Sequence, residues 1–182
     1  MDDNTAIMTA DQVIAQLDLK PLPVEGGYFK RTYYTAEVIP RAALPSRYTN
    51  PRRYGGAIFY LLNSDLDSFS AIHSLLTDEI YHFYLGDPVE LLLLYPEGQT
   101  ARITLGSDLL NGQHVQFVAP RGVWQGSHLL PGGCWALMGT TMAPAYEDGD
   151  YIHGDRDLLE VQYPTEADLI RRLTRPTGGE AA

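Results

Sequence analysis

Short apolar segments divided by glycine- and proline-rich turns restrict what this chain of 182 residues can fold into. Proline cannot donate a hydrogen bond to a sheet, and glycine accepts the positive φ angles that tight turns require. Between these turns the residues are mainly aromatic, aliphatic or β-branched, as strands prefer. This pattern predicts an all-β sandwich or barrel. The clearest turns are Gly86-Asp87-Pro88, Pro96-Glu97-Gly98, Pro120-Arg121-Gly122 and Pro131-Gly132-Gly133.

Helices are expected only at the two ends of the chain. Thr9 and Gln12 form a capping-box pattern, which predicts a helix that the prolines at 21 and 23 terminate. Thr165 is expected to cap a last short helix. We expect one domain over residues 1–182, with a core at about 11–164 and a frayed tail at 174–182. The expected strands cover residues 28–35, 57–62, 69–75, 79–85, 89–95, 101–105, 114–118 and 134–142.

Composition narrows the classes of partner. The formal net charge is -10, and so acidic a surface repels nucleic acid and anionic lipid. Cys134 is the only cysteine, so the chain cannot form an internal disulfide. The acidic N-terminus has no signal-peptide pattern, and no apolar run is long enough to span a membrane. We therefore expect a cytoplasmic protein that binds a small molecule, with no nucleic-acid or membrane partner.

Two motifs carry the functional information. One residue separates His73 from Leu75, three separate Leu75 from Glu79, and six separate Glu79 from Gly86. Downstream, residues 120–125 read PRGVWQ. The spacing resembles the two signature motifs of the cupin superfamily. In metal-binding cupins, two histidines and the glutamate of the first motif, with a histidine of the second, hold a divalent ion.

Longer segments resemble one uncharacterised cupin family. They are EGGYFKRTYYT (25–35), SFSAIHS (68–74), DEIYHFYLGDP (78–88), PRGVWQ (120–125) and MGTTMAPAYE (138–147). The resemblance implies a jelly-roll (double-stranded β-helix) cupin barrel that forms a homodimer and has no settled activity. Members have been likened to dTDP-sugar epimerases because the folds are alike. Those enzymes use a histidine base and a tyrosine acid, and Thr141 or Met142 stands at the tyrosine's approximate place here.

Two substitutions weaken a metal site at these positions. Leu75 occupies the place of the second histidine, and Gln125 occupies the place of the last one. Leucine has no donor atom, and an amide holds a transition ion less well than imidazole or carboxylate. We therefore expect no metal cofactor. The alternative is a divalent ion held by His73, Glu79 and Gln125.

The candidate site follows from the same residues. His73 and Glu79 are the candidate catalytic residues, because imidazole and carboxylate transfer protons near neutral pH. A core histidine satisfied by hydrogen bonds is the alternative for His73. Side chains alternate along a strand, so Tyr81 and Phe83 should face the same cavity as Glu79. The candidate ligand-binding residues are Glu25, Tyr81, Phe83 and Gln125.

Several positions receive structural assignments. His82 should point away from Glu79 and serve a structural role. His114, His128 and His153 are expected at the surface, and the acidic run 147–150 is expected to be solvated. The loop at 40–53 either covers a cavity mouth or is simply a loop.

Three functions remain open. The first is the binding of a small polar ligand, sugar-like or nucleotide-sugar-like, with metal-independent isomerisation or epimerisation as its enzymatic form. The second is a metal-dependent cupin enzyme, an oxygenase or isomerase. The third is a non-enzymatic dimeric binding or structural module.

Overall fold

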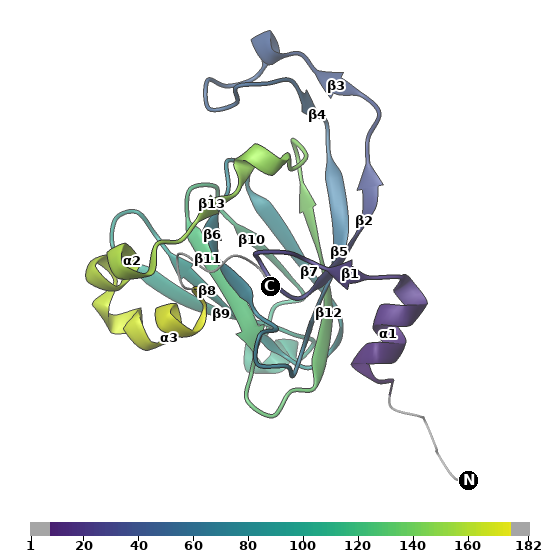
Figure 1. Cartoon of the computed structure of the whole chain (residues 1–182), viewed down its shortest axis with the longest axis vertical. Helices are drawn as coiled ribbons and strands as arrows, with labels where there is room; N and C mark the ends of the chain where they lie inside the picture. The colour runs from purple at the N-terminus through teal and green to yellow at the C-terminus, as the bar shows by residue number, and fades with distance from the viewer. Residues whose placement is uncertain (1–7, 176–182) are drawn as a thin grey trace.

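Two antiparallel sheets lie face to face in the computed structural model, which describes residues 8–175 (Figure 1). They form the jelly-roll barrel that the sequence predicts. The larger sheet contains, in spatial order, β1 (Lys20–Pro21), β2 (Tyr28–Tyr34), β5 (Gly56–Asn63), β12 (Trp135–Met142), β7 (Glu79–Gly86) and β10 (Gln116–Ala119). The smaller sheet contains β13 (Ile152–His153), β6 (Ser70–Ser74), β11 (Trp124–Leu129), β8 (Val89–Leu94) and β9 (Thr100–Leu105).

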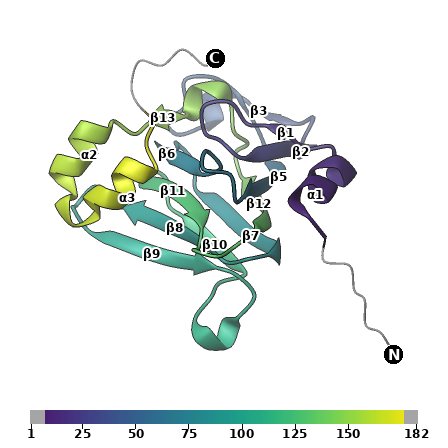
Figure 2. The same ribbon diagram turned by 60° about the horizontal axis from the view of Figure 1, so that its bottom comes forward.

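The densest apolar run of the chain, on β8, is buried on both of its faces. Leu91 and Leu93 belong to the core between the two sheets. Leu92 and Leu94 point outward and pack beneath two C-terminal helices, α2 (Arg156–Gln162) and α3 (Ala167–Arg172). Figure 2 shows these helices against the smaller sheet. The helical cover explains why this strand lacks the polar alternation of a half-exposed strand.

The N-terminal helix, α1 (Ala10–Leu17), packs on the outside of the larger sheet, where Val13 joins a cluster with Leu61 and Leu137. The predicted capping box is present between Thr9 and Gln12. The helix ends at Asp18, which adopts a left-handed conformation, so it terminates before the prolines. Lys20 and Pro21 instead form the edge strand β1.

Most predicted strands are confirmed, but β11 and α2 were not predicted. Gly126, Ser127 and His128 make β11 look polar, although all three are buried. His128 is therefore not a surface residue: its ring hydrogen-bonds the carbonyl oxygen of Leu129 at 2.7 Å.

Two C-terminal predictions were wrong. Thr165 does not cap a helix, because it lies inside a 3₁₀ turn, η4 (Pro164–Glu166), that leads into α3. Thr174, assigned to the frayed tail, is buried and donates its hydroxyl to the carbonyl oxygen of Ile170 at 2.7 Å. The rest of the predicted tail, residues 176–182, lies outside the described residues.

The loop at 40–53 belongs to an arm that extends beyond the barrel in Figure 1. Its strands β3 (Val38–Ile39) and β4 (Arg52–Arg53) pair with each other, and η1 (Arg41–Ala43) lies between them. Tyr48 joins the arm to the barrel, because its buried hydroxyl lies 2.7 Å from the Thr77 hydroxyl.

Candidate functional site

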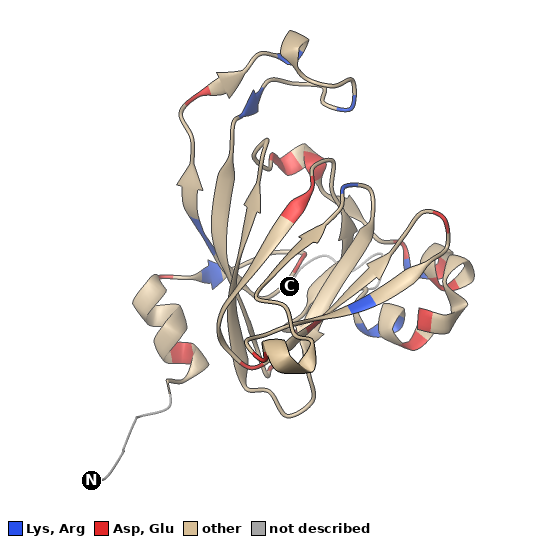
Figure 3. Cartoon of the chain, turned by 180° about the vertical axis from the view of Figure 1, so that it is seen from behind, with Lys and Arg blue, Asp and Glu red and all other residues tan. Residues whose placement is uncertain are grey.

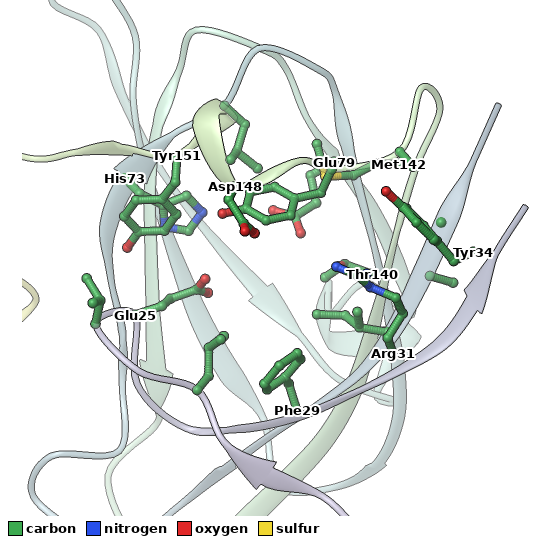
Figure 4. Close-up of a pocket in the computed structure, with 18 of the residues that line it drawn as sticks. Glu25, Phe29, Arg31, Tyr34, His73, Glu79, Thr140, Met142, Asp148 and Tyr151 are labelled. Atoms are coloured by element: carbon green, nitrogen blue, oxygen red, sulfur yellow. The ribbon is translucent and has the colours of Figure 1, made fainter. Parts of the chain in front are cut away.

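A pocket of about 520 Å³ opens at one end of the barrel (Figure 4). Its walls come from the turn at 22–25, β2, β5, the β6–β7 junction, the end of β12 and the segment 145–153. Residues of the loop at 40–53 are absent from this lining, so that loop does not cover the mouth of this pocket. The volume is within the range typical of small-molecule sites.

Glu25 reaches the pocket because two glycines shape the turn that carries it. Gly26 and Gly27 have φ angles of 101° and 68°. A Cβ atom on Gly26 would lie 2.4 Å from the carbonyl oxygen of Phe69, so the turn packs directly on the barrel backbone. The glycines therefore permit close approach to the protein's own backbone. They place Glu25 at the pocket wall, where its Oε1 accepts a 2.8 Å hydrogen bond from Ser70.

Burial raises the pKa of the Glu25 carboxyl above its ordinary value of 4.5. The nearby Glu79 carboxylate acts in the same direction, while His73 and the Ser70 hydroxyl act against it. Glu25 therefore takes up a proton more readily than a solvated glutamate does.

His73 and Glu79 come together at the inner end of the pocket, although they stand on different sheets. Both are buried and both line it. His73 is the last residue but one of β6, and its cross-strand partner is Gln125. Glu79 begins β7. His73, Glu79 and Gln125 therefore lie close together.

Gln125 connects the other two residues but does not line the pocket. Its Nε2 donates to Glu79 Oε2 at 2.6 Å and lies 3.2 Å from His73 Nε2. The Nδ1 of His73 donates to the carbonyl oxygen of Ala71 at 2.8 Å. A carbonyl oxygen only accepts, so neutral His73 carries its proton on Nδ1 and Nε2 accepts from Gln125. Gln125 was expected to contact a ligand directly, but this geometry does not support such a contact.

Tyr81 and Phe83 do face the same side as Glu79, but they do not wall the pocket. Both are buried in the core between the sheets with residues such as Leu91 and Met138. The prediction failed because large side chains fill the barrel interior beyond Glu79, so the cavity ends there. His82 points outward, as expected, and its Nε2 lies 3.1 Å from the hydroxyl of Thr141.

The acidic run 147–150, which was expected to be solvated, forms the roof of the pocket together with the tyrosines on either side of it. Tyr146, Asp148 and Tyr151 line the pocket, and Tyr151 stacks on the ring of His73 with 4.6 Å between centroids. The hydroxyl of Tyr151 is buried and has no hydrogen-bond partner within residues 8–175. Burial, followed by the charge of Glu25, raises the pKa of Tyr151. Burial, followed by Asp148, raises the pKa of Tyr146 to about 12.

Two contacts hold this roof in place. Asp150, within η3 (Asp148–Asp150), is fully buried and accepts a 2.6 Å hydrogen bond from Arg52 of β4. Glu147 accepts a 2.6 Å hydrogen bond from Tyr34 of β2. Asp150 is thus not solvated, contrary to expectation. The signal for this role lies in Tyr146 and Tyr151, the two tyrosines that flank the acidic run.

The charges of the pocket are arranged in two regions. Glu25, Glu79 and Asp148 gather near His73, and Figure 3 shows acidic residues on η3 and at the start of β7. Arg31 approaches from the other side, with its guanidinium 4.4 Å from the centre of the Tyr34 ring. In the described part of the chain it is the one Lys or Arg that lines the pocket, and no carboxylate among residues 8–175 pairs with it.

Residues 11–152 match the sequence profile of a family of the cupin superfamily, DUF985. The chain belongs to this cupin family.

Relatives of this cupin support the same assignment. The chain is 31% identical over 153 residues to the uncharacterized protein YML079W of Saccharomyces cerevisiae, covering 79% of this chain and 75% of the yeast protein. The structure of protein SO0799 from Shewanella oneidensis is similar with a TM-score of 0.80 and 29% identity, over 93% of this chain and 99% of that one. A hypothetical protein from Leishmania major has the same fold, with a TM-score of 0.81, 23% identity, and coverage of 93% and 100%. These names state no activity.

The metal centre of metal-binding cupins does not fit the residues of this member. Leu75 is buried against the pocket and offers no donor atom. His73 Nε2 and Glu79 Oε2, the atoms that would have to bind the ion, already accept hydrogen bonds from Gln125. Within residues 8–175, no group of three or more His, Cys, Asp or Glu side chains is arranged to hold an ion.

No helix in the described part of this cupin combines the length and the apolar character that a membrane crossing requires.

Proposed function

We propose that the barrel pocket binds a small polyhydroxylated ligand with one anionic group, as in a sugar acid, and that the protein isomerises it by metal-independent proton transfer. The observation that carries this proposal is the division of charge in the pocket. Glu25, Glu79 and Tyr151 surround one end, and Arg31 approaches from the other side.

The lining favours a polar ligand with hydroxyl groups. Carboxylates accept hydrogen bonds from hydroxyls, and a guanidinium binds a carboxylate through two parallel N–H donors. The aromatic ring of Phe29 offers an apolar wall for the face of a sugar ring. Glu25, Glu79 and Asp148 repel additional negative charge, so a monoanion is favoured over a nucleotide diphosphate. Of the two ligand classes expected from the sequence, the pocket therefore favours a sugar-like ligand over a nucleotide-sugar-like one.

Proton transfer would use Glu25 and Tyr151. Glu25 takes a proton from a carbon next to a carbonyl, and its raised pKa suits this role. Tyr151 keeps its proton and donates a hydrogen bond to the carbonyl oxygen while negative charge develops there. Glu25 then returns the proton to the former carbonyl carbon, while the proton of the neighbouring hydroxyl moves to the former carbonyl oxygen, so an aldose and a ketose interconvert without gain or loss of atoms. His73 supports the Tyr151 ring, because direct action as a base would require its Nε2 to leave Gln125.

The test is incubation with a panel of aldoses, ketoses and uronic acids in D₂O. We expect NMR to show deuterium at a carbon next to a carbonyl in at least one uronic acid. Glu25→Gln and Tyr151→Phe should abolish this exchange, because they remove the base and the hydrogen-bond donor. Glu97→Gln, the same chemical change in an exposed turn, should leave it intact. Absence of both binding and exchange across the panel would contradict the proposal.

Arg31 determines the preference for an anionic ligand. A hydrogen bond to a charged group contributes about 1.5–3 kcal/mol, so Arg31→Gln should weaken uronic-acid binding by roughly tenfold or more. Binding of the matching neutral sugar should change little. Arg172→Gln, at an exposed position on α3, is the control. Calorimetric titration with the uronic acid and the neutral sugar checks both expectations.

The two other functions make different predictions. Binding without exchange would favour the non-enzymatic module. An equimolar metal content in protein purified without chelator would favour the metal-dependent enzyme. The homodimer and the cytoplasmic location stay predictions, and sedimentation velocity tests the first of them.

A further inference from the structure

We propose that the carboxamide of Gln125 replaces the metal ion as the cross-link at the centre of this cupin barrel. One nitrogen atom of this side chain joins the imidazole of His73 to the carboxylate of Glu79. In metal-binding cupins an ion makes the corresponding connection. The inference concerns the interior of the barrel and does not depend on which ligand enters the pocket.

The amide nitrogen has the number of hydrogens that this role requires. One N–H donates to Glu79 Oε2 at 2.6 Å, and the other is directed to His73 Nε2 at 3.2 Å. Gln125 and His73 are cross-strand partners in the smaller sheet, whereas Glu79 starts β7 in the larger sheet. The three side chains are 2–8% exposed, so these bonds are largely shielded from water. The amide thus connects the two sheets.

The charges of its neighbours fix the orientation of the amide. If the amide were reversed, Oε1 would stand 2.6 Å from a carboxylate oxygen, and two acceptors repel each other. Reversal would therefore need one proton on Glu79 and another on Nε2 of His73, whose Nδ1 proton is already engaged with Ala71. The observed orientation requires only a neutral imidazole and an ionised carboxylate.

The same hydrogen bonds prevent an ion from binding, because they occupy the atoms that would have to coordinate it. An ion would need the Nε2 lone pair of His73 and an oxygen of Glu79, and both face the N–H groups of Gln125. The only free acceptor of the amide is its Oε1, which is buried without a partner among residues 8–175. Leu75, beside His73 on the pocket wall, adds no donor.

The first experiment reads the protonation of the His73 ring by NMR on ¹⁵N-histidine-labelled protein at about pH 8, where an unperturbed histidine is neutral. We expect the wild-type signals of His73 to show a proton on Nδ1 and an accepting Nε2. Gln125→Glu replaces the donor by a second carboxylate beside Glu79. The ring should then hold protons on both nitrogens, because Nε2 gains an anionic acceptor.

The control is Ser127→Ala on the same strand. Ser127 is fully buried and its hydroxyl has no partner within residues 8–175, so its loss should leave the His73 spectrum unchanged. A wild-type spectrum with the proton on Nε2 would overturn the proposal, even if Gln125→Glu failed to fold. An identical His73 spectrum in wild type and in folded Gln125→Glu would overturn it too.

The second experiment restores the ion. Leu75→His combined with Gln125→His recreates the donor set of a metal-binding cupin. We expect the double variant to take up an equimolar amount of Ni²⁺ and to unfold at a higher temperature with the ion than without it. The wild type should do neither. Equimolar uptake by the wild type that Glu79→Gln abolishes, or no uptake by a folded double variant, would contradict the proposal.

Discussion

At the scale of single residues, the pocket contains a carboxyl group whose burial is unfavourable for the fold. This group is Glu25: burial raises the pKa of its carboxyl, and keeping it ionised is unfavourable. His73 and Glu79 differ from it, since Gln125 satisfies them. The sequence identified all four residues through the family motifs. It did not reveal Tyr151, because stacking on His73 depends on the path of a segment far along the chain.

Glu25→Gln should stabilise the protein at neutral pH. The folded state holds the Glu25 proton more tightly than the unfolded state, whose pKa is near 4.5. Between that value and the raised folded pKa, the native state binds more protons, so Glu25 makes stability fall as pH rises. The glutamine variant removes this loss, so its gain over wild type should grow as pH rises above 4.5 and level off above the raised pKa of the folded state.

Urea unfolding as a function of pH measures this gain. Glu97→Gln provides the matched change at an exposed position and should show no comparable trend. A gain of equal size at every pH would mean that the charge of Glu25 is not its source. A variant that is more stable yet inactive would be the signature of a functional carboxylate.

At the scale of elements, the glycine turn at 23–27 shows how backbone packing positions a functional group. A strand or helix could not bring Glu25 back over the barrel mouth while its own carbonyl oxygen accepts from the N–H of Ala71 at 2.8 Å. The Gly26-Gly27 pair in the sequence indicates such a turn, but it does not reveal which part of the protein packs against it. The structure shows that the neighbour is the backbone at Phe69.

Gly26→Ala should destabilise the protein more than Gly98→Ala does. Gly26 and Gly98 have φ angles of 101° and 90°, so both substitutions incur a backbone strain of about 1–3 kcal/mol. Only at Gly26 would the new Cβ also collide with a backbone oxygen, whereas nothing lies within 4 Å at Gly98. Thermal unfolding of the two variants separates strain from collision. Equal losses would show that the turn can move away from Phe69.

At the scale of the whole molecule, a buried ion pair joins parts of the chain that are distant in sequence. Arg52 belongs to the projecting arm and Asp150 to the pocket roof, and their side chains are 5% and 0% exposed. Glu147 and Tyr34 make a second connection between the roof and the larger sheet. The arm therefore supports the pocket through this pair, although its loop at 40–53 does not line the cavity.

Asp150→Asn should lower stability by about 3–5 kcal/mol, because it leaves the Arg52 guanidinium buried without its counter-charge. Replacing both partners, as in Arg52→Met with Asp150→Leu, should recover most of this loss. Urea unfolding of wild type, Arg52→Met, Asp150→Leu and the double variant forms the necessary cycle. A loss near zero in Asp150→Asn would show that the roof opens to water around Arg52.

The sequence by itself determined most of the strands, the capped N-terminal helix and the residues of the pocket's inner end. The strands and the helix follow from local rules, because turn residues and strand alternation act over a few neighbours, whereas the site residues follow from the resemblance to the cupin motifs. It did not reveal β11, whose small and polar residues are buried only because other strands flank it.

Tertiary structure decided where the cavity ends and what encloses it. Tyr81 and Phe83 alternate as predicted, but whether a barrel interior is filled or hollow depends on the summed volume of side chains from both sheets. The roof over His73 and the amide between His73 and Glu79 likewise depend on segments separated by many residues. Such contacts arise when packing brings distant groups together, and no local pattern records them.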